Sequence, residues 1–226
     1  MKILLLYIFS FYCFAFAQGQ AQATINNNNT TEIPVELKNT TEIKIFIDTR
    51  DNKSYKYGKI GNQTWMLENL NFDYPGSFYY NNSTKNHEKY GRLYTYEIAN
   101  HVCPAGWHLP SAKEWSELIE FSGGANIAAK VLKAAELWQK SENTGLDILN
   151  FSAYPGGLFT GKNSSKSGGT DNTFASLGYA GYFWVSDTTL TPNWGKTITF
   201  FYNQNFIYKS GAERGSYLSV RCIKYP

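Results

Sequence analysis

Hydrophobic and polar residues alternate along several short stretches of this chain. In residues 43–48 isoleucine occupies every odd position, which predicts a strand with Phe46 partly covered. Two further runs flank Gly61-Asn62, a residue pair typical of tight turns. The alternating or strand-like runs after the first are 55–60, 63–70, 93–98, 181–186, 196–202 and 217–223.

The spacing becomes helical at Ser111. The run Ser111-Ala112-Lys113-Glu114 has the form of a capping box, in which the serine and glutamate side chains each accept a hydrogen bond from the other's backbone. Apolar residues at positions 115, 118 and 119 share one helical face, and Gly123-Gly124 ends the helix. A second amphipathic segment covers residues 127–132.

Polar segments separate these elements. Residues 18–42 are rich in Asn and Thr, which predicts a flexible spacer. Residues 155–173 are rich in Gly, Ser, Thr and Asn, which predicts a long loop. Short, mostly antiparallel strands, two helices and long loops together predict an α+β domain over residues 43–226.

Aromatic residues are abundant in this sequence, whereas charged residues are scarce. The chain has 17 Tyr, 15 Phe and 6 Trp, and only 17% of its residues are charged, against about 25% in typical proteins. So many rings exclude a disordered chain. The net charge of +3 is too small for an obligate nucleic-acid binder, so no nucleic-acid partner is expected.

The first 17 residues have the features of an export signal. Lys2 is followed by an apolar stretch over residues 3–16, and Ala15-Phe16-Ala17 predicts cleavage before Gln18. No other segment is apolar enough to cross a bilayer, so we expect no stable membrane span after signal removal. The expected location is outside the cytoplasm: secreted, at the cell surface or in the periplasm.

Two cysteines remain once the signal, with Cys13, is removed. In an oxidising compartment, Cys103 and Cys222 favour a disulfide that closes a loop of about 120 residues. The alternative is a catalytic Cys103 with His101 or His108. Nothing in the sequence orients either histidine for that role.

Six phrases in fixed order resemble the Fibrobacter succinogenes major paralogous domain family. The similarity covers residue 43 to the C-terminus. The phrases are IGNQTWMLENL (60–70), YGRLY (90–94), CPAGWHLPS (103–111), FSAYPGG (151–157), YFWVS (182–186) and SVRC (219–222).

The resemblance carries expectations about fold and setting. The family is similar to the C-type-lectin-like superfamily and to formylglycine-generating enzymes in the helix start at 109–115 and in a terminal strand near Arg221-Cys222. This implies a C-type-lectin-like fold whose two chain ends pair as strands, and it supports the Cys103–Cys222 bridge. The family occurs in exported and surface proteins and has no settled biochemical function.

The sequence gives little support for a catalytic site or a metal site. Formylglycine-generating enzymes use a copper site built from a cysteine pair, and here only Cys222 lies in the corresponding region. The three histidines share no metal-ligand spacing, so no metal site and no cofactor are expected. Glu68 and Glu114 could form a glycosidase-like carboxylate pair, but the capping box already accounts for Glu114. Residues 191–194 lack the carboxylate of the lectin calcium–sugar motifs.

The tryptophans divide into two groups. Those within the family phrases, at 65, 107, 115 and 184, have apolar neighbours and are expected in the core. Trp138 and Trp194 have polar neighbours, and an exposed ring can stack on a sugar or anchor a protein. The ligand-binding residues predicted from the sequence are Trp194, Asn193, Asp187, Asp171 and Asn172.

The function expected from the sequence is a non-enzymatic exported module that binds a glycan or a cell-surface protein through its long loops. Two alternatives stay open. One is a structural or accessory subunit of a surface assembly. The other is an enzyme of the formylglycine-generating type.

Overall fold

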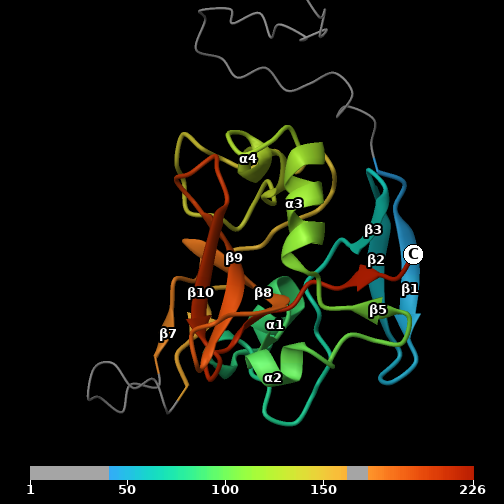
Figure 1. The fold of residues 1–226 in the computed structure, drawn as a ribbon, viewed down its shortest axis with the longest axis vertical. Helices are drawn as coiled ribbons and strands as arrows, with labels where there is room; N and C mark the ends of the chain where they lie inside the picture. Colours follow the sequence, from blue (N-terminus) through green and yellow to red (C-terminus); the bar gives the residue numbers. More distant parts are fainter. Residues whose placement is uncertain (1–40, 162–172) are drawn as a thin grey trace, which may run out of the picture. The chain divides into compact units, whose positions relative to one another are not determined.

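The computed structural model describes residues 41–161 and 173–226 (Figure 1). The predicted export signal lies outside these residues, as does almost all of the predicted spacer. The described residues form a mixed α+β fold with short, mostly antiparallel strands and a few short helices. The α+β class predicted from the sequence is therefore confirmed.

The first sheet combines strands from both ends of the described chain. Its five strands follow the order β1-β2-β3-β12-β5, and every neighbouring pair is antiparallel. The C-terminal strand lies between β3 and β5 rather than beside the first strand. The bounds are β1 (Lys44–Asp48), β2 (Lys53–Ile60), β3 (Gln63–Met66), β12 (Ile223–Lys224) and β5 (Trp107–His108).

The second sheet has the order β10-β9-β8-β11-β4, in which only the β11–β8 pair is parallel. A small antiparallel pair, β6 with β7, forms a separate ladder, and Phe159 of β6 is bridged to Tyr217 beside β11 of the second sheet. The bounds are β4 (Leu93–Tyr94), β6 (Leu158–Phe159), β7 (Phe174–Ala175), β8 (Ala180–Thr188), β9 (Trp194–Phe201), β10 (Tyr208–Glu213) and β11 (Leu218–Ser219).

Within the described residues, four α-helices and one 3₁₀ turn, Tyr80–Asn82, complete the fold. The capping box at Ser111 and Glu114 is formed, so the predicted helix start is confirmed. The run 93–98 is only partly a strand, because the Thr95 side chain accepts a hydrogen bond from the Ile98 N–H and so caps a short helix there. The bounds are α1 (Thr84–Tyr90), α2 (Tyr96–Ala99), α3 (Ala112–Phe121) and α4 (Ala128–Leu132).

The core holds most of the large rings. One apolar cluster joins α3 and α4 to both sheets, and Figure 1 shows α3 between the sheets. Within it Trp65, Trp115 and Phe151 pack ring against ring. Trp107 and Trp184 belong to a second cluster. All four tryptophans of the family phrases are thus buried, as predicted.

The first strand departs from a simple core-facing pattern. Phe46 is partly covered and packs on Trp107, as predicted. The isoleucines at 43, 45 and 47 point outward, while the buried Asp48 is bound by Arg50. Alternation in the sequence therefore identified the strand, but the more apolar set of side chains lies on its solvent face.

Candidate functional site

The predicted site residue Asp187 supports helix α3. Its Oδ2 accepts a hydrogen bond from the Ala112 N–H at 2.6 Å, and its Oδ1 lies 3.9 Å from Lys196 Nζ. A carboxylate at a helix N-terminus compensates free N–H groups. Much of the hydrogen-bonding capacity of Asp187 is therefore used inside the fold. Asp171 and Asn172 lie outside the described residues.

Trp194 and Asn193 lie at the tight turn between β8 and β9. The Trp194 ring is half-buried over Gly211, where an added Cβ would come 3.3 Å from the ring. Asn193 is exposed with φ +61°, and its carbonyl accepts a hydrogen bond from the Arg214 N–H at 2.7 Å. Arg214 Nε also donates to the Trp194 carbonyl at 3.0 Å. This turn is braced by β10 and the residues that follow it, and the Trp194 ring is only partly exposed.

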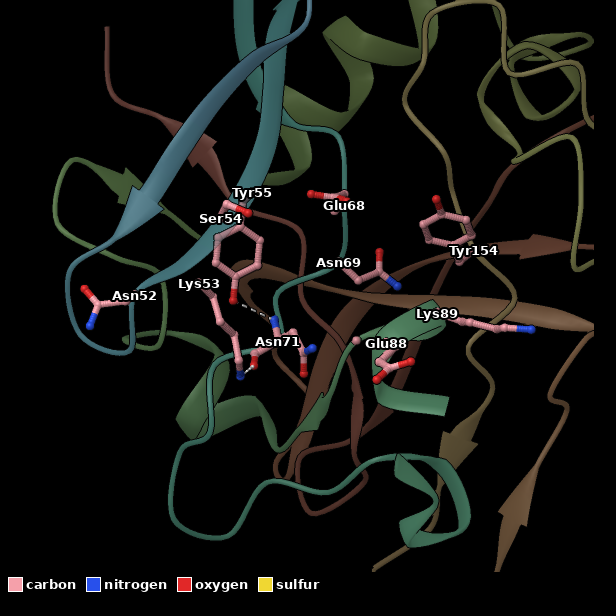
Figure 2. A pocket seen from close by; sticks show the side chains of 11 residues that line it. Asn52, Lys53, Ser54, Tyr55, Glu68, Asn69, Asn71, Glu88, Lys89 and Tyr154 are labelled. Carbon is pink, nitrogen blue, oxygen red and sulfur yellow. Dashed lines mark hydrogen bonds between the residues drawn. The ribbon is translucent and has the colours of Figure 1, made fainter. Parts of the chain in front are cut away.

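A polar pocket of about 410 Å³ lies at another place, between the first sheet and α1 (Figure 2). Four separate chain segments build it: the start of β2, the segment after β3, the end of α1 with the following glycine, and the loop before β6. Among its residues, Glu68 is the one that the carboxylate-pair hypothesis names. The lining residues are Asn52, Lys53, Ser54, Tyr55, Glu68, Asn69, Asn71, Glu88, Lys89, Gly91 and Tyr154.

A buried arginine holds the wall of this pocket in place. Arg221 donates from Nη2 to Asn69 Oδ1 at 2.6 Å and to the Ser152 carbonyl at 2.9 Å, and it also donates to the Phe151 carbonyl. Asn69 in turn donates to the Tyr90 carbonyl at 2.9 Å. Burial lowers the pKa of Arg221 to about 10, so the guanidinium stays charged at neutral pH. Three of the pocket's segments are therefore tied to one cation.

Gly91 lets the end of α1 approach the pocket wall closely. Its φ is +74°, in the region that favours glycine, and an added Cβ would lie 2.8 Å from the Leu70 carbonyl oxygen. The same Cβ would lie 2.9 Å from Asn69 Cβ. Any side chain at position 91 would therefore push α1 away from the pocket.

Two charged lining residues are held by their own neighbours. Lys53 Nζ donates to the Asn71 carbonyl at 2.5 Å and lies 3.3 Å from Asp51 Oδ2. Glu68 Oε2 accepts a hydrogen bond from the Lys56 N–H at 2.7 Å. Figure 2 shows the Lys53 and Tyr55 side chains meeting the backbone of Asn71.

Several other lining side chains remain available to a ligand. Within residues 41–161 and 173–226, the side chains of Asn52, Glu88, Lys89 and Tyr154 make no hydrogen bond and no ion pair. Asn52, Glu88 and Lys89 are exposed, and Tyr154 is partly exposed. An amide, a carboxylate, an ammonium group and a phenol ring thus surround one pocket.

The carboxylate pair considered from the sequence is not gathered in this pocket. Glu114 is not among the lining residues; its Oε2 accepts hydrogen bonds from Ser111, and its Oε1 bonds to His108 Nε2 at 2.8 Å. Burial raises the pKa of Glu114, but the hydrogen bonds from Ser111 and His108 outweigh that effect and leave the pKa below its ordinary value. Glu114 is thus held as an anion, whereas a general acid needs a raised pKa.

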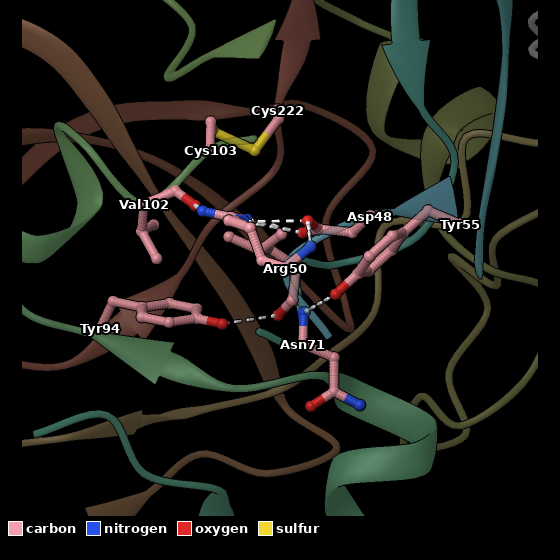
Figure 3. The surroundings of a disulfide bond; sticks show 9 residues. Asp48, Arg50, Tyr55, Asn71, Tyr94, Val102, Cys103 and Cys222 are labelled. Atoms are coloured by element: carbon pink, nitrogen blue, oxygen red, sulfur yellow. Dashed lines mark hydrogen bonds and ion pairs between the residues drawn. A yellow bond between two sulfur atoms is a disulfide. The ribbon is translucent and has the colours of Figure 1, made fainter. Parts of the chain in front are cut away.

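The predicted disulfide between Cys103 and Cys222 is present, with Cα atoms 5.9 Å apart (Figure 3). It joins the loop before β5 to the segment before β12. Beside it, Arg50 Nη1 donates to the Val102 carbonyl at 2.8 Å while the same side chain binds Asp48. The bridge therefore belongs to a structural cluster, and Cys103 has no free thiol.

Residues 41–161 and 173–226 contain no group of three or more His, Cys, Asp or Glu side chains placed to hold a metal ion. No helix within these residues is both long and apolar enough to traverse a bilayer.

Comparison with known proteins identifies one family. The model of the Fibrobacter succinogenes major domain matches residues 59–224, which include most of the pocket and all of the second sheet. No curated protein matches the chain, and no solved structure does.

Proposed function

The chain belongs to the Fibrobacter succinogenes major domain family, and from this premise we propose that it is an exported, non-enzymatic module whose polar pocket binds a glycan. The observation that carries the proposal is the set of unengaged groups around one cavity: Asn52, Glu88, Lys89 and Tyr154. The C-type-lectin-like architecture remains part of this proposal.

The chemistry of the free groups suits a sugar. An amide group both donates and accepts hydrogen bonds, a carboxylate accepts them from neighbouring hydroxyls, and an ammonium group adds three donors. A partly exposed phenol ring offers an apolar face and a polar tip. A volume of about 410 Å³ falls in the range of small-ligand pockets, so one or two sugar residues would fill it.

The family phrases support the same pocket as the binding site. The phrase 60–70 supplies Glu68 and Asn69, the phrase 90–94 supplies Gly91, and the phrase 151–157 supplies Tyr154. Arg221, from the phrase 219–222, lies behind them and fixes Asn69. Four of the six phrases that carry the resemblance therefore converge on the pocket or on its support.

A glycan array, followed by calorimetry with the bound glycan, tests the proposal. Tyr154→Ala and Glu88→Gln should each weaken binding about tenfold, which corresponds to about 1.4 kcal/mol for one hydrogen-bonding or stacking contact. Trp194→Ala is the matched control at the other candidate position, and it should leave affinity unchanged. Chelation of calcium should have no effect.

The opposite result has a clear meaning. If Trp194→Ala abolishes binding while Tyr154→Ala does not, the turn between β8 and β9 is the site and the pocket assignment is wrong. If no glycan binds under any condition, the binding-module proposal fails.

A second candidate function, a structural subunit of a surface assembly, is favoured by one specific feature: an apolar stripe on an open sheet edge.

A further inference from the structure

Strand β1 forms an open edge of the first sheet and carries an exposed apolar stripe. We define the isoleucine stripe as Ile43, Ile45 and Ile47, whose side chains are 48%, 59% and 58% exposed. Within residues 41–161 and 173–226, β1 pairs only with β2 and ends the strand order of its sheet (Figure 1). Protein edges usually carry charges, proline or bulges that discourage pairing, whereas the outer face of β1 is purely aliphatic.

The backbone of the stripe also points toward the open edge. Lys56 on β2 turns its N–H toward Glu68 Oε2 and its carbonyl toward the Leu67 N–H, both on the β3 side. Ile45 lies directly opposite Lys56, so the two form a pair that exchanges no backbone hydrogen bonds. The N–H and C=O of Ile45 therefore point away from β2. Because the direction of the backbone groups repeats every two residues along a strand, the N–H and C=O groups of Ile43 and Ile47 point the same way as those of Ile45.

The neighbouring charges leave the edge accessible. Lys44 points to the opposite face, where its Nζ lies 3.2 Å from Glu42 Oε2. Lys56 shares the stripe's face opposite Ile45, but its Nζ lies 3.9 Å from Glu68 Oε1, on the side away from β1. An incoming strand would thus meet three isoleucines and a row of outward backbone groups.

We propose that the occupant of this edge is β1 of a second copy of the chain. The stripe is self-complementary, because its three isoleucines are evenly spaced about Ile45. An antiparallel register centred on Ile45 pairs Ile45 with its own copy and Ile43 with Ile47 of the other copy. All six isoleucines then form cross-strand pairs on one face, and the two-fold symmetry closes the contact after two chains.

The interface is small, which sets its expected strength. One five-residue strand and three half-exposed side chains bury less than the roughly 800 Å² per partner of a stable complex. The dimer should therefore dissociate readily and form at high micromolar concentration. The stripe precedes residue 59, where the family match begins. The inference does not depend on the glycan proposal.

Sedimentation velocity on the exported chain, from about 1 µM to about 1 mM, tests the dimer. The chain should shift from monomer to dimer over this range. Ile45→Lys should remain monomeric because it places a charge at the centre of the stripe. Ile45→Pro should also remain monomeric, because it removes an outward N–H without removing a hydrogen bond to β2.

A matched control and a covalent test complete the experiment. Leu190→Lys changes an aliphatic side chain that is 104% exposed in the β8–β9 turn, so it should dimerise like the parent. Ile45→Cys should form a disulfide-linked dimer under mild oxidation, whereas Leu190→Cys should not. A parent chain that stays monomeric throughout, or a dimer that persists in both Ile45→Lys and Ile45→Pro, would overturn the proposal.

Discussion

Removing the disulfide tests how strongly the two ends of the domain depend on a covalent link. The bridge joins residues 119 positions apart. In the chain-entropy model, a loop of this length gives an upper stabilisation of about 5 kcal/mol at 25 °C. Domains of this size usually have unfolding free energies of about 5–15 kcal/mol, so the predicted loss is a large share of the total.

The loss of stability should arise mainly in the unfolded state, because the unfolded chain gains conformational entropy without the bridge. The folded core around Trp65 and Trp115 should stay packed, because both rings are fully buried in the apolar cluster that contains neither cysteine. We therefore expect the Cys103→Ala/Cys222→Ala variant to keep its near-ultraviolet circular dichroism. Its unfolding free energy should fall by about 3–5 kcal/mol, and its denaturant m-value should rise as the unfolded chain expands.

Guanidinium unfolding followed by tryptophan fluorescence measures both quantities. The parent protein with its disulfide reduced serves as the control, since it keeps both cysteine side chains. A loss below about 1 kcal/mol in both samples would refute the loop-closure argument. A molten near-ultraviolet spectrum would refute the claim that the bridge acts mainly on the unfolded chain.

Three further predictions concern single residues. Burial raises the pKa of Asp48, but the hydrogen bonds and charge of Arg50 outweigh that effect and leave the pKa below 3.8. The folded state should therefore lose stability as the pH falls below about 4. In an acid titration, Asp48→Asn should show a shallower loss of stability. Burial lowers the pKa of Lys133 to about 8, so as the pH rises the folded state releases this proton before the unfolded state does. The ionisation of Lys133 therefore makes the unfolding free energy rise between about pH 8 and pH 10. Lys133→Met should remove that rise in denaturant titrations. Gly91→Ala should lower the unfolding free energy by about 2–4 kcal/mol, because its Cβ would collide with the Leu70 carbonyl. Thermal unfolding measures this loss, and an unchanged melting temperature would contradict the close approach.

Local sequence signals predicted the elements that depend on neighbours in the chain. The capping box at Ser111, the turn at Gly61 and the burial of the phrase tryptophans are all observed. The Cys103–Cys222 pairing follows from compartment and parity, and the family resemblance supports it. Each of these features depends on a few consecutive residues or on a simple count.

The pocket could not be found in this way, because its lining comes from four distant segments. Asn52, Glu88 and Lys89 are each ordinary surface residues in the sequence, and only the fold places them around one cavity with Tyr154. The outward face of β1 was also hidden, since alternation does not say which set of side chains faces solvent. On the buried face, Phe46 packs on Trp107, and Arg50, which binds Asp48, also donates to the Val102 carbonyl; both of these partners lie far along the chain.

The most direct test of the account is the affinity of the parent chain and of Tyr154→Ala for the same glycan, measured side by side by calorimetry. The account predicts saturable binding by the parent and about tenfold weaker binding by the variant, with both proteins equally folded. Equal affinities for the two proteins would contradict the assignment of the pocket as the binding site.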